Sequence, residues 1–258
     1  IPSTFDPRLI SVIPAAVAKA AVDSGVARKK IDDFEIYKDQ LKQRLDPTVT
    51  IMQGINSFIK KNQTRIVFAD GEDENTLKAA IAFKNSKLGI PILVGKESKI
   101  KEQIRNIGYN ENFDIEIINS KDEEKRKKYL KHLFEKLQRE QGLLERDCDR
   151  LLRNDRVIWA TSMVACGDAD GAVTGNTRRF GASLEKIKQV VDVRKGEIMF
   201  GLNMVVHKGR TIFIGDTSVH EYPTSEELAE IAISTARVVR LFGFEPKVAF
   251  VSHSTFGQ

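Results

Sequence analysis

The sequence has little of the chemistry that marks a metal centre or a disulfide-rich secreted protein. Its two cysteines, Cys148 and Cys166, cannot build a disulfide framework or a four-ligand zinc site. The four histidines show no metal-ligand spacing. We therefore expect no bound metal, and a reducing, cytoplasmic compartment.

Long apolar runs and a strong charge of one sign are also missing. No apolar run approaches the roughly 20 residues of a membrane-spanning helix, and no basic-then-apolar secretory signal opens the sequence. The net charge is only +5, which slightly favours anionic partners such as phosphates. Residues 121–150 carry 10 basic and 8 acidic residues, which is typical of a solvated helix face. We expect neither a membrane nor a nucleic-acid partner.

The hydrophobic pattern, with 41% hydrophobic and 30% charged residues, predicts an α/β fold. Short apolar runs typical of buried strands begin at Arg65, Ile90, Phe113 and Asp170. Helical segments separate them, including charged helices over 121–154 and an apolar, buried helix over 156–165. Strands and helices that alternate at this spacing predict a parallel sheet flanked by helices.

The region before the first strand is predicted to be helical. Apolar residues between Leu9 and Val22 recur at helical spacing, and Gly25 is a suitable stop. A second helix is expected over 31–45 and a third over about 49–61. This tail has too few apolar residues for its own core, so we expect it to pack on something else.

The region after the sheet predicts a second, smaller lobe. An antiparallel hairpin is expected over 198–214, and Thr224 or Ser225 caps a helix that runs to about Phe242. The apolar run 248–251 predicts a further strand. Such a strand normally leads into a helix in an α/β fold, so we expect the sequence to be a piece of a longer protein at both ends. The predicted domains are a tail (1–46), a linker helix (47–62), a first lobe (63–190) and an incomplete second lobe (191–258).

The most favoured site is the stretch 167–185. A strand end that runs into a turn of glycine, threonine and arginine offers backbone N–H groups and hydroxyls to an anion. Two adjacent arginines add donors suited to phosphate. The predicted anion contacts here are Thr177, Arg178, Arg179 and Ser183. The alternative is a sharp turn with exposed arginines.

Two further polar turns follow predicted strands. Asp216 follows the hairpin, and Ser254 and Thr255 follow the run 248–251. We expect all three to face the first turn across the cleft between the two lobes. The alternative for Asp216 is a structural role in its loop.

Several segments together resemble the phosphate acetyltransferase/butyryltransferase family. The segments that carry the resemblance are residues 65–74 (RIVFADGEDE), 91–95 (PILVG), 167–175 (GDADGAVTG), 216 with 223–232 (PTSEELAEIA) and 247–257 (KVAFVSHSTFG). They cover about residues 63–258. The resemblance implies a two-lobed phosphotransacetylase-like fold with a parallel sheet, truncated at its C-terminus.

Residues 1–27 resemble the end of a bacterial malic enzyme catalytic domain. The composite is similar to the large NADP-dependent malic enzymes, which carry a phosphotransacetylase-like C-terminal domain. The resemblance implies that the parent protein converts malate to pyruvate and CO2, with NADP and a divalent metal bound in the malic enzyme domain. This part would bind acetyl-CoA or CoA as a regulator and aid homo-oligomerisation.

Two departures from the family bear on catalysis. Active members have an arginine where this sequence has Glu185, after Leu184, although Arg178 or Arg179 is an alternative source of positive charge. The family's C-terminal Ser-Arg and Asp catalytic region is expected beyond residue 258, so the catalytic residues are unknown. We therefore expect a non-catalytic module. The alternatives are an active phosphate acetyltransferase, which makes acetyl phosphate and CoA from acetyl-CoA and phosphate, and a purely structural oligomerisation domain.

Overall fold

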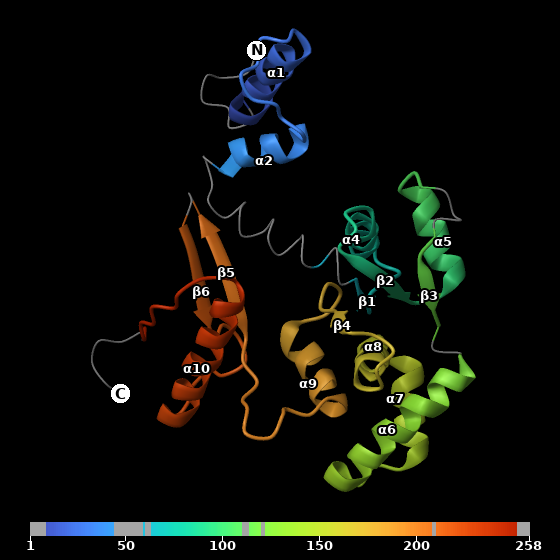
Figure 1. Ribbon diagram of the computed structural model, residues 1–258. Coiled ribbons are helices and arrows are strands. Elements are labelled where there is room, and N and C mark those ends of the chain that lie inside the picture. Colours follow the sequence, from blue (N-terminus) through green and yellow to red (C-terminus); the bar gives the residue numbers. More distant parts are fainter. Residues whose placement is uncertain are drawn as a thin grey trace. The chain divides into compact units, whose positions relative to one another are not determined.

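The computed structural model describes residues 9–43, 59, 63–109, 114–119, 122–207 and 210–251. The chain divides into two units (Figure 1). One is Ser57–Asp192, and the other combines Ile1–Asn56 with Val193–Gln258. The domain boundaries expected from the sequence stay a prediction.

A four-stranded parallel sheet forms the centre of the Ser57–Asp192 unit (Figure 1). Its strands are β1 (Thr64–Phe68), β2 (Gly89–Val94), β3 (Glu116–Ile118) and β4 (Gly171–Val173), in the order β3-β2-β1-β4. Phe68 of β1 pairs with Leu93 of β2 and with Val173 of β4. All three pairings between these strands are parallel, which confirms the predicted parallel sheet.

Helices pack on both faces of this sheet. They are α4 (Glu74–Asn85), α5 (Glu97–Asn106), α6 (Glu123–Gln141), α7 (Glu145–Asn154), α8 (Arg156–Ala165) and α9 (Phe180–Val190). Phe68 and Leu93 belong to a core with α4 and α5, whereas Val67 and Ile92 belong to a second core with α6, α7 and α8. Residues 157–163 of α8 are all buried, as its apolar sequence predicts.

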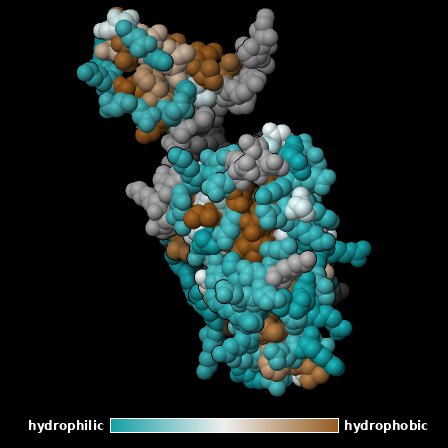
Figure 2. All heavy atoms as spheres, turned by 90° about the vertical axis from the view of Figure 1, so that its right-hand side faces the viewer, coloured by the Kyte–Doolittle hydropathy of each residue, from teal (hydrophilic) through white to brown (hydrophobic). Residues whose placement is uncertain are grey.

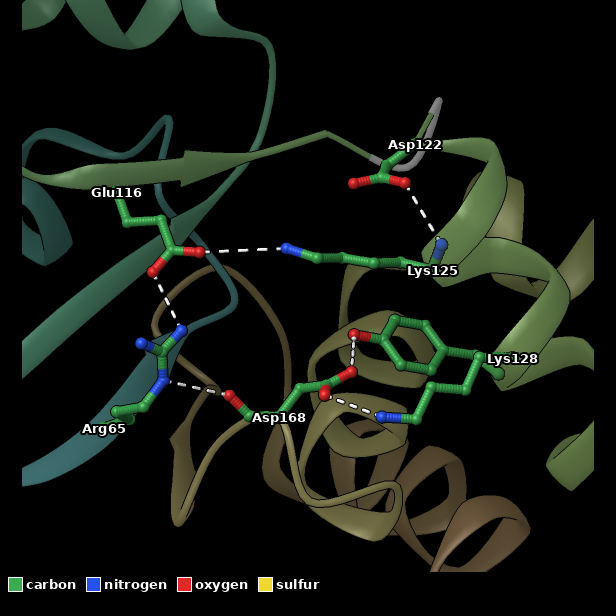
Figure 3. A network of polar contacts seen from close by, with 7 residues as sticks. Arg65, Glu116, Asp122, Lys125, Lys128 and Asp168 are labelled. Atoms are coloured by element: carbon green, nitrogen blue, oxygen red, sulfur yellow. Dashed lines mark hydrogen bonds and ion pairs between the residues drawn. The ribbon is translucent and has the colours of Figure 1, made fainter.

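A polar network ties the amino ends of the strands to α6 (Figure 3). Asp168, just before β4, accepts hydrogen bonds from the Tyr129 hydroxyl and from Lys128 Nζ, both at 2.7 Å. Its carbonyl oxygen accepts a bond from Arg65 Nε at 3.2 Å, and Arg65 also pairs with Glu116 at 2.9 Å. Burial alone would raise the pKa of Asp168, but the bonds from Lys128 and Tyr129 outweigh it and lower that pKa. The network therefore stabilises the sheet edge opposite to the one where α/β folds bind ligands.

Replacing Tyr129 by phenylalanine is expected to lower the free energy of unfolding by about 1 kcal/mol at pH 7. The ring keeps its edge-to-face contact with Trp159, 5.1 Å between centroids, so only the bond to Asp168 is lost. Because the pKa of Asp168 is lowered on folding, its contribution is fully present above about pH 5 and is lost as the pH falls below about 4, through the lowered pKa of the folded state. The difference between variant and wild type, measured by urea unfolding, should shrink in that range. The control Tyr222→Phe removes an exposed hydroxyl, and an equal loss in both variants would contradict this account.

The other unit contains a pair of helices and, separately in the sequence, a hairpin with one helix. Helices α1 (Leu9–Asp23) and α2 (Phe34–Gln43) pack on each other. Strands β5 (Leu202–His207) and β6 (Arg210–Gly215) form an antiparallel hairpin, which helix α10 (Ser225–Leu241) packs against. Thr224 caps α10 in a capping box with Glu227, so the predicted hairpin and cap are confirmed.

The predicted strand over 248–251 is wrong. These residues have no strand conformation, and Phe250 and Val251 are exposed. A strand needs a neighbour for its hydrogen-bond ladder, and no strand in the described part of the chain pairs with this run. The helix expected over 49–61 lies outside the described residues, except for Ile59.

Helix α1 has an exposed apolar face. Val12, Ile13 and Val17 are each more than half exposed, and hydrophobic atoms are visible on the α1–α2 segment at the top of Figure 2. Such a face is typical of a surface that another part of a protein covers. Among the described residues, no helix has the length and apolar character needed to cross a membrane.

Candidate functional site

The loops after β1 and β4 meet at the carboxyl edge of the sheet, where open α/β sheets bind ligands. β1 leads into Asp70, which is only 3% exposed. β4 leads into a turn in which Gly175 has a φ of 99°, a backbone conformation that favours glycine. Thr177 Oγ1 donates to Asp70 Oδ1 at 2.6 Å, whereas Asp70 Oδ2 has no partner among the described residues. The hydroxyl predicted to contact an anion therefore already donates to an internal carboxylate.

The same turn is tied to the starts of two helices. Asn176 Nδ2 donates to Asp73, the N-cap of α4. Arg178 Nη1 donates to Asp155 Oδ2 at 2.7 Å, while Asp155 Oδ1 caps α8. The backbone N–H of Thr76 lowers the pKa of Asp73 and keeps it ionised at neutral pH. Two carboxylates of this chain thus occupy helix N-termini, which are places where an anion is stabilised.

The start of α9 differs, because no side chain caps it. Arg179 stands at its N-cap position, is exposed and has no ion-pair partner within the described residues. Ser183, one turn on, is 4% exposed, and its Oγ has no described partner. A Cβ built on Gly181 would meet no atom within 4 Å, so this side of the first turn of α9 faces open space. These features form the strongest candidate for an anion site in the described structure.

A third arginine at this edge is engaged. Arg156, at the start of α8, pairs with Glu72 at 2.9 Å. Burial alone would raise the pKa of Glu72, but the hydrogen bond from the backbone N–H of Lys96 and the charge of Arg156 outweigh it and lower that pKa. Of Arg156, Arg178 and Arg179, only Arg179 therefore lacks an acidic partner among the described residues.

Asp216 belongs to the other unit and has a structural environment. Its Oδ1 accepts bonds from the backbone N–H groups of Gly201, Ser218 and Val219 at 2.8–3.1 Å. Its Oδ2 accepts bonds from the backbone N–H of His220 at 2.8 Å and from His220 Nδ1 at 2.9 Å. This carboxylate joins the start of β5 to the turn after β6, as the structural alternative for Asp216 predicts. Its predicted role in ligand contact stays a prediction.

The structure brings together the predicted residues Thr177, Arg178, Arg179 and Ser183, whereas Ser254 and Thr255 lie outside the described residues. Sequence reasoning missed the acidic partners Asp70, Asp73 and Asp155 and the amide of Asn176. A signal was available for two of them, because aspartate directly before a helix is a preferred N-cap. Their contacts to the turn span up to 107 residues of sequence, and no local pattern shows such contacts.

Comparison with known proteins decides the family. Residues 50–258 match the phosphate acetyl/butaryl transferase family. The chain belongs to this family. Among solved structures, a phosphotransacetylase from Streptococcus pyogenes is 26% identical, with a TM-score of 0.71 over 81% of this chain and 63% of that one. This likeness confirms that the phosphate acetyl/butaryl transferase fold predicted from sequence is the observed fold.

Curated relatives add a second relationship. An NADP-dependent malic enzyme of Rhizobium meliloti is 43% identical over the whole of this chain, and a probable one of Rickettsia prowazekii is 40% identical. The chain spans 34% of the length of each. A phosphate acetyltransferase of Nitratidesulfovibrio vulgaris is 30% identical over 76% of the chain and 28% of its own length. The chain therefore resembles the phosphotransacetylase-like part of NADP-dependent malic enzymes.

Proposed function

We propose that this chain is a regulatory module of an NADP-dependent malic enzyme, and that it binds acetyl-CoA without transferring the acetyl group. The observation that carries the proposal is the start of α9. No side chain caps its backbone amides. Arg179 has no acidic partner among the described residues, and the Ser183 hydroxyl is buried without a hydrogen-bond partner among them. Coenzyme A carries several phosphate groups, and a helix N-terminus with an arginine suits a phosphate.

The charges around the site argue against acetyl transfer. That reaction needs a base for the thiol, and positive charge for the phosphate and the oxyanion. Arg156 and Arg178 are paired with Glu72 and Asp155. Glu185, which stands where the resemblance places an arginine, is an exposed carboxylate on α9. An inorganic phosphate ion would therefore meet repulsion where active members offer attraction.

The extent of the similarities supports the link to a malic enzyme. The acyltransferase family matches only from residue 50, whereas the malic enzymes match the whole chain. Residues 1–49 are therefore shared with the oxidoreductases and lie outside the family match. In this proposal the tail packs on the malic enzyme domain, where NADP and a divalent metal bind during conversion of malate to pyruvate. Homo-oligomerisation is a second role of the module.

The test combines binding and turnover in the full-length parent enzyme. We expect acetyl-CoA to bind, as measured by calorimetry, and to change the rate of malate oxidation, because a ligand that prefers one state of an enzyme shifts its population. We expect no phosphate-dependent release of CoA from acetyl-CoA. Turnover above background would make the chain an active phosphate acetyltransferase instead. Absence of both binding and turnover would leave the structural role.

Replacing Glu185 by arginine tests the charge argument directly. The change removes a negative charge and adds a positive one near the start of α9, so we expect inorganic phosphate to bind at least about threefold more tightly. Titration calorimetry with phosphate measures the effect. The control Glu102→Arg makes the same charge change at an exposed position of α5. Equal gains in the two variants would show that only the net charge matters.

A further inference from the structure

We propose that Asp155 competes with the ligand for Arg178 and thereby sets the affinity of the site and its preference for phosphate groups; this inference rests on the proposed function. Arg178 Nη1 lies 2.7 Å from Asp155 Oδ2, and the two side chains are 35% and 13% exposed. Arg178 is next to Arg179, the arginine without a described acidic partner at the start of α9. The arginine best placed to join Arg179 on an anion is therefore held by an internal carboxylate.

The geometry allows Arg178 to leave without disturbing the fold around Asp155. The other oxygen, Oδ1, accepts the backbone N–H groups of Val157 and Ile158 at 2.9 and 3.3 Å and so caps α8. These bonds hold the carboxylate in place whether or not Arg178 is paired with it. A ligand that takes Arg178 thus needs only a rotation of an arginine side chain that is one-third exposed.

The exchange selects for the charge of the ligand. Arg178 must leave the carboxylate of Asp155 to reach the ligand. A ligand that offers only another carboxylate with a single negative charge therefore gains little binding free energy from the exchange. A phosphate group offers up to two negative charges and three oxygens, and the arginine fork matches this geometry. The site is therefore expected to bind phosphate-bearing ligands such as acetyl-CoA, and to discriminate against small carboxylates such as acetate.

The variant Asp155→Asn isolates the competition. Asparagine is as good an N-cap as aspartate, so α8 keeps its cap while Arg178 loses its charged partner. We expect acetyl-CoA and inorganic phosphate to bind about two- to fivefold more tightly. This range is the change in affinity that corresponds to the free energy of a partly exposed ion pair. In the Asp155→Asn background, Arg178→Gln should remove this gain, whereas in wild type, where Asp155 competes for the arginine, the same change should weaken binding by a smaller factor.

The matched control is Asp73→Asn. Asp73 caps α4 and contacts the same turn through Asn176, but no arginine among the described residues is paired with it. Titration calorimetry on the full-length enzyme gives all affinities, and circular dichroism checks folding. A gain specific to Asp155→Asn and dependent on Arg178 supports the competition.

The remaining outcomes separate the two proposals. If wild type binds acetyl-CoA and Asp155→Asn gains no more than Asp73→Asn, the competition is overturned while the proposed function stands. A gain that survives Arg178→Gln overturns it equally. If the folded wild type and every folded variant fail to bind acetyl-CoA and phosphate, the proposed function itself fails.

Discussion

Replacing Gly181 by aspartate is expected to weaken acetyl-CoA binding by about 10- to 100-fold. Gly181 lies in the uncapped first turn of α9, two residues after Arg179. A carboxylate there would stand where we place the ligand's phosphate. It would repel the incoming anion, since charges a few ångströms apart at a protein surface interact strongly.

The fold should tolerate this change. A Cβ at Gly181 meets no atom within 4 Å, and an acidic residue in the first turn of a helix is favoured by the helix dipole. Gly181→Ala is the control, because it adds a methyl group to the same open space without a charge. Calorimetric titration should show loss of binding in the aspartate variant alone. Unchanged affinity in a folded Gly181→Asp protein would place the ligand elsewhere.

The fold could be predicted from sequence because its elements have strong local signals. β1 is a short apolar run, α8 is mostly apolar, and Thr224 with Glu227 forms a recognisable capping box. The run 248–251 has the same local signal as β1, but a strand also needs a partner. That requirement is a property of the whole fold, so the pattern alone gave a wrong prediction.

The candidate site was predictable only as a set of residue types. Threonine and arginine in a glycine turn indicated anion binding for Thr177 and Arg178. The structure shows that Asp70 and Asp155, 107 and 23 residues earlier, hold these two side chains. Pairing changes the chemistry of a donor without changing its sequence, so the sequence could not separate Arg178, which is paired, from Arg179, which has no described acidic partner. The roles of Ser254 and Thr255 stay predictions.

Replacing Asp216 by asparagine is expected to lower the free energy of unfolding by about 3 kcal/mol at pH 7. The side chain is 3% exposed, and it accepts hydrogen bonds from Gly201, Ser218, Val219 and His220. An amide keeps one acceptor oxygen and turns an NH2 group toward donors that the second oxygen had satisfied. Gly201 shows how tightly the carboxylate fits, since a Cβ there would stand 2.9 Å from Asp216 Oδ1. Hydrogen exchange of the β5 and β6 amides should speed up in the variant.

The pH dependence separates the charge of Asp216 from its shape. Burial alone would raise its pKa, but the hydrogen bonds from Ser218, His220 and Gly201 hold that pKa well below its ordinary value. A pKa lowered on folding stabilises the protein above the unfolded pKa of about 4, and this stabilisation is lost as the pH falls below it. Wild type should therefore lose stability progressively as the pH falls from about 5 to 3 and below, and the gap to Asp216→Asn should narrow. Glu221→Gln, at an exposed neighbouring position, should keep the wild-type profile. A constant gap across this range would mean that the asparagine acts by steric misfit, and that the charge of Asp216 contributes nothing to the hairpin.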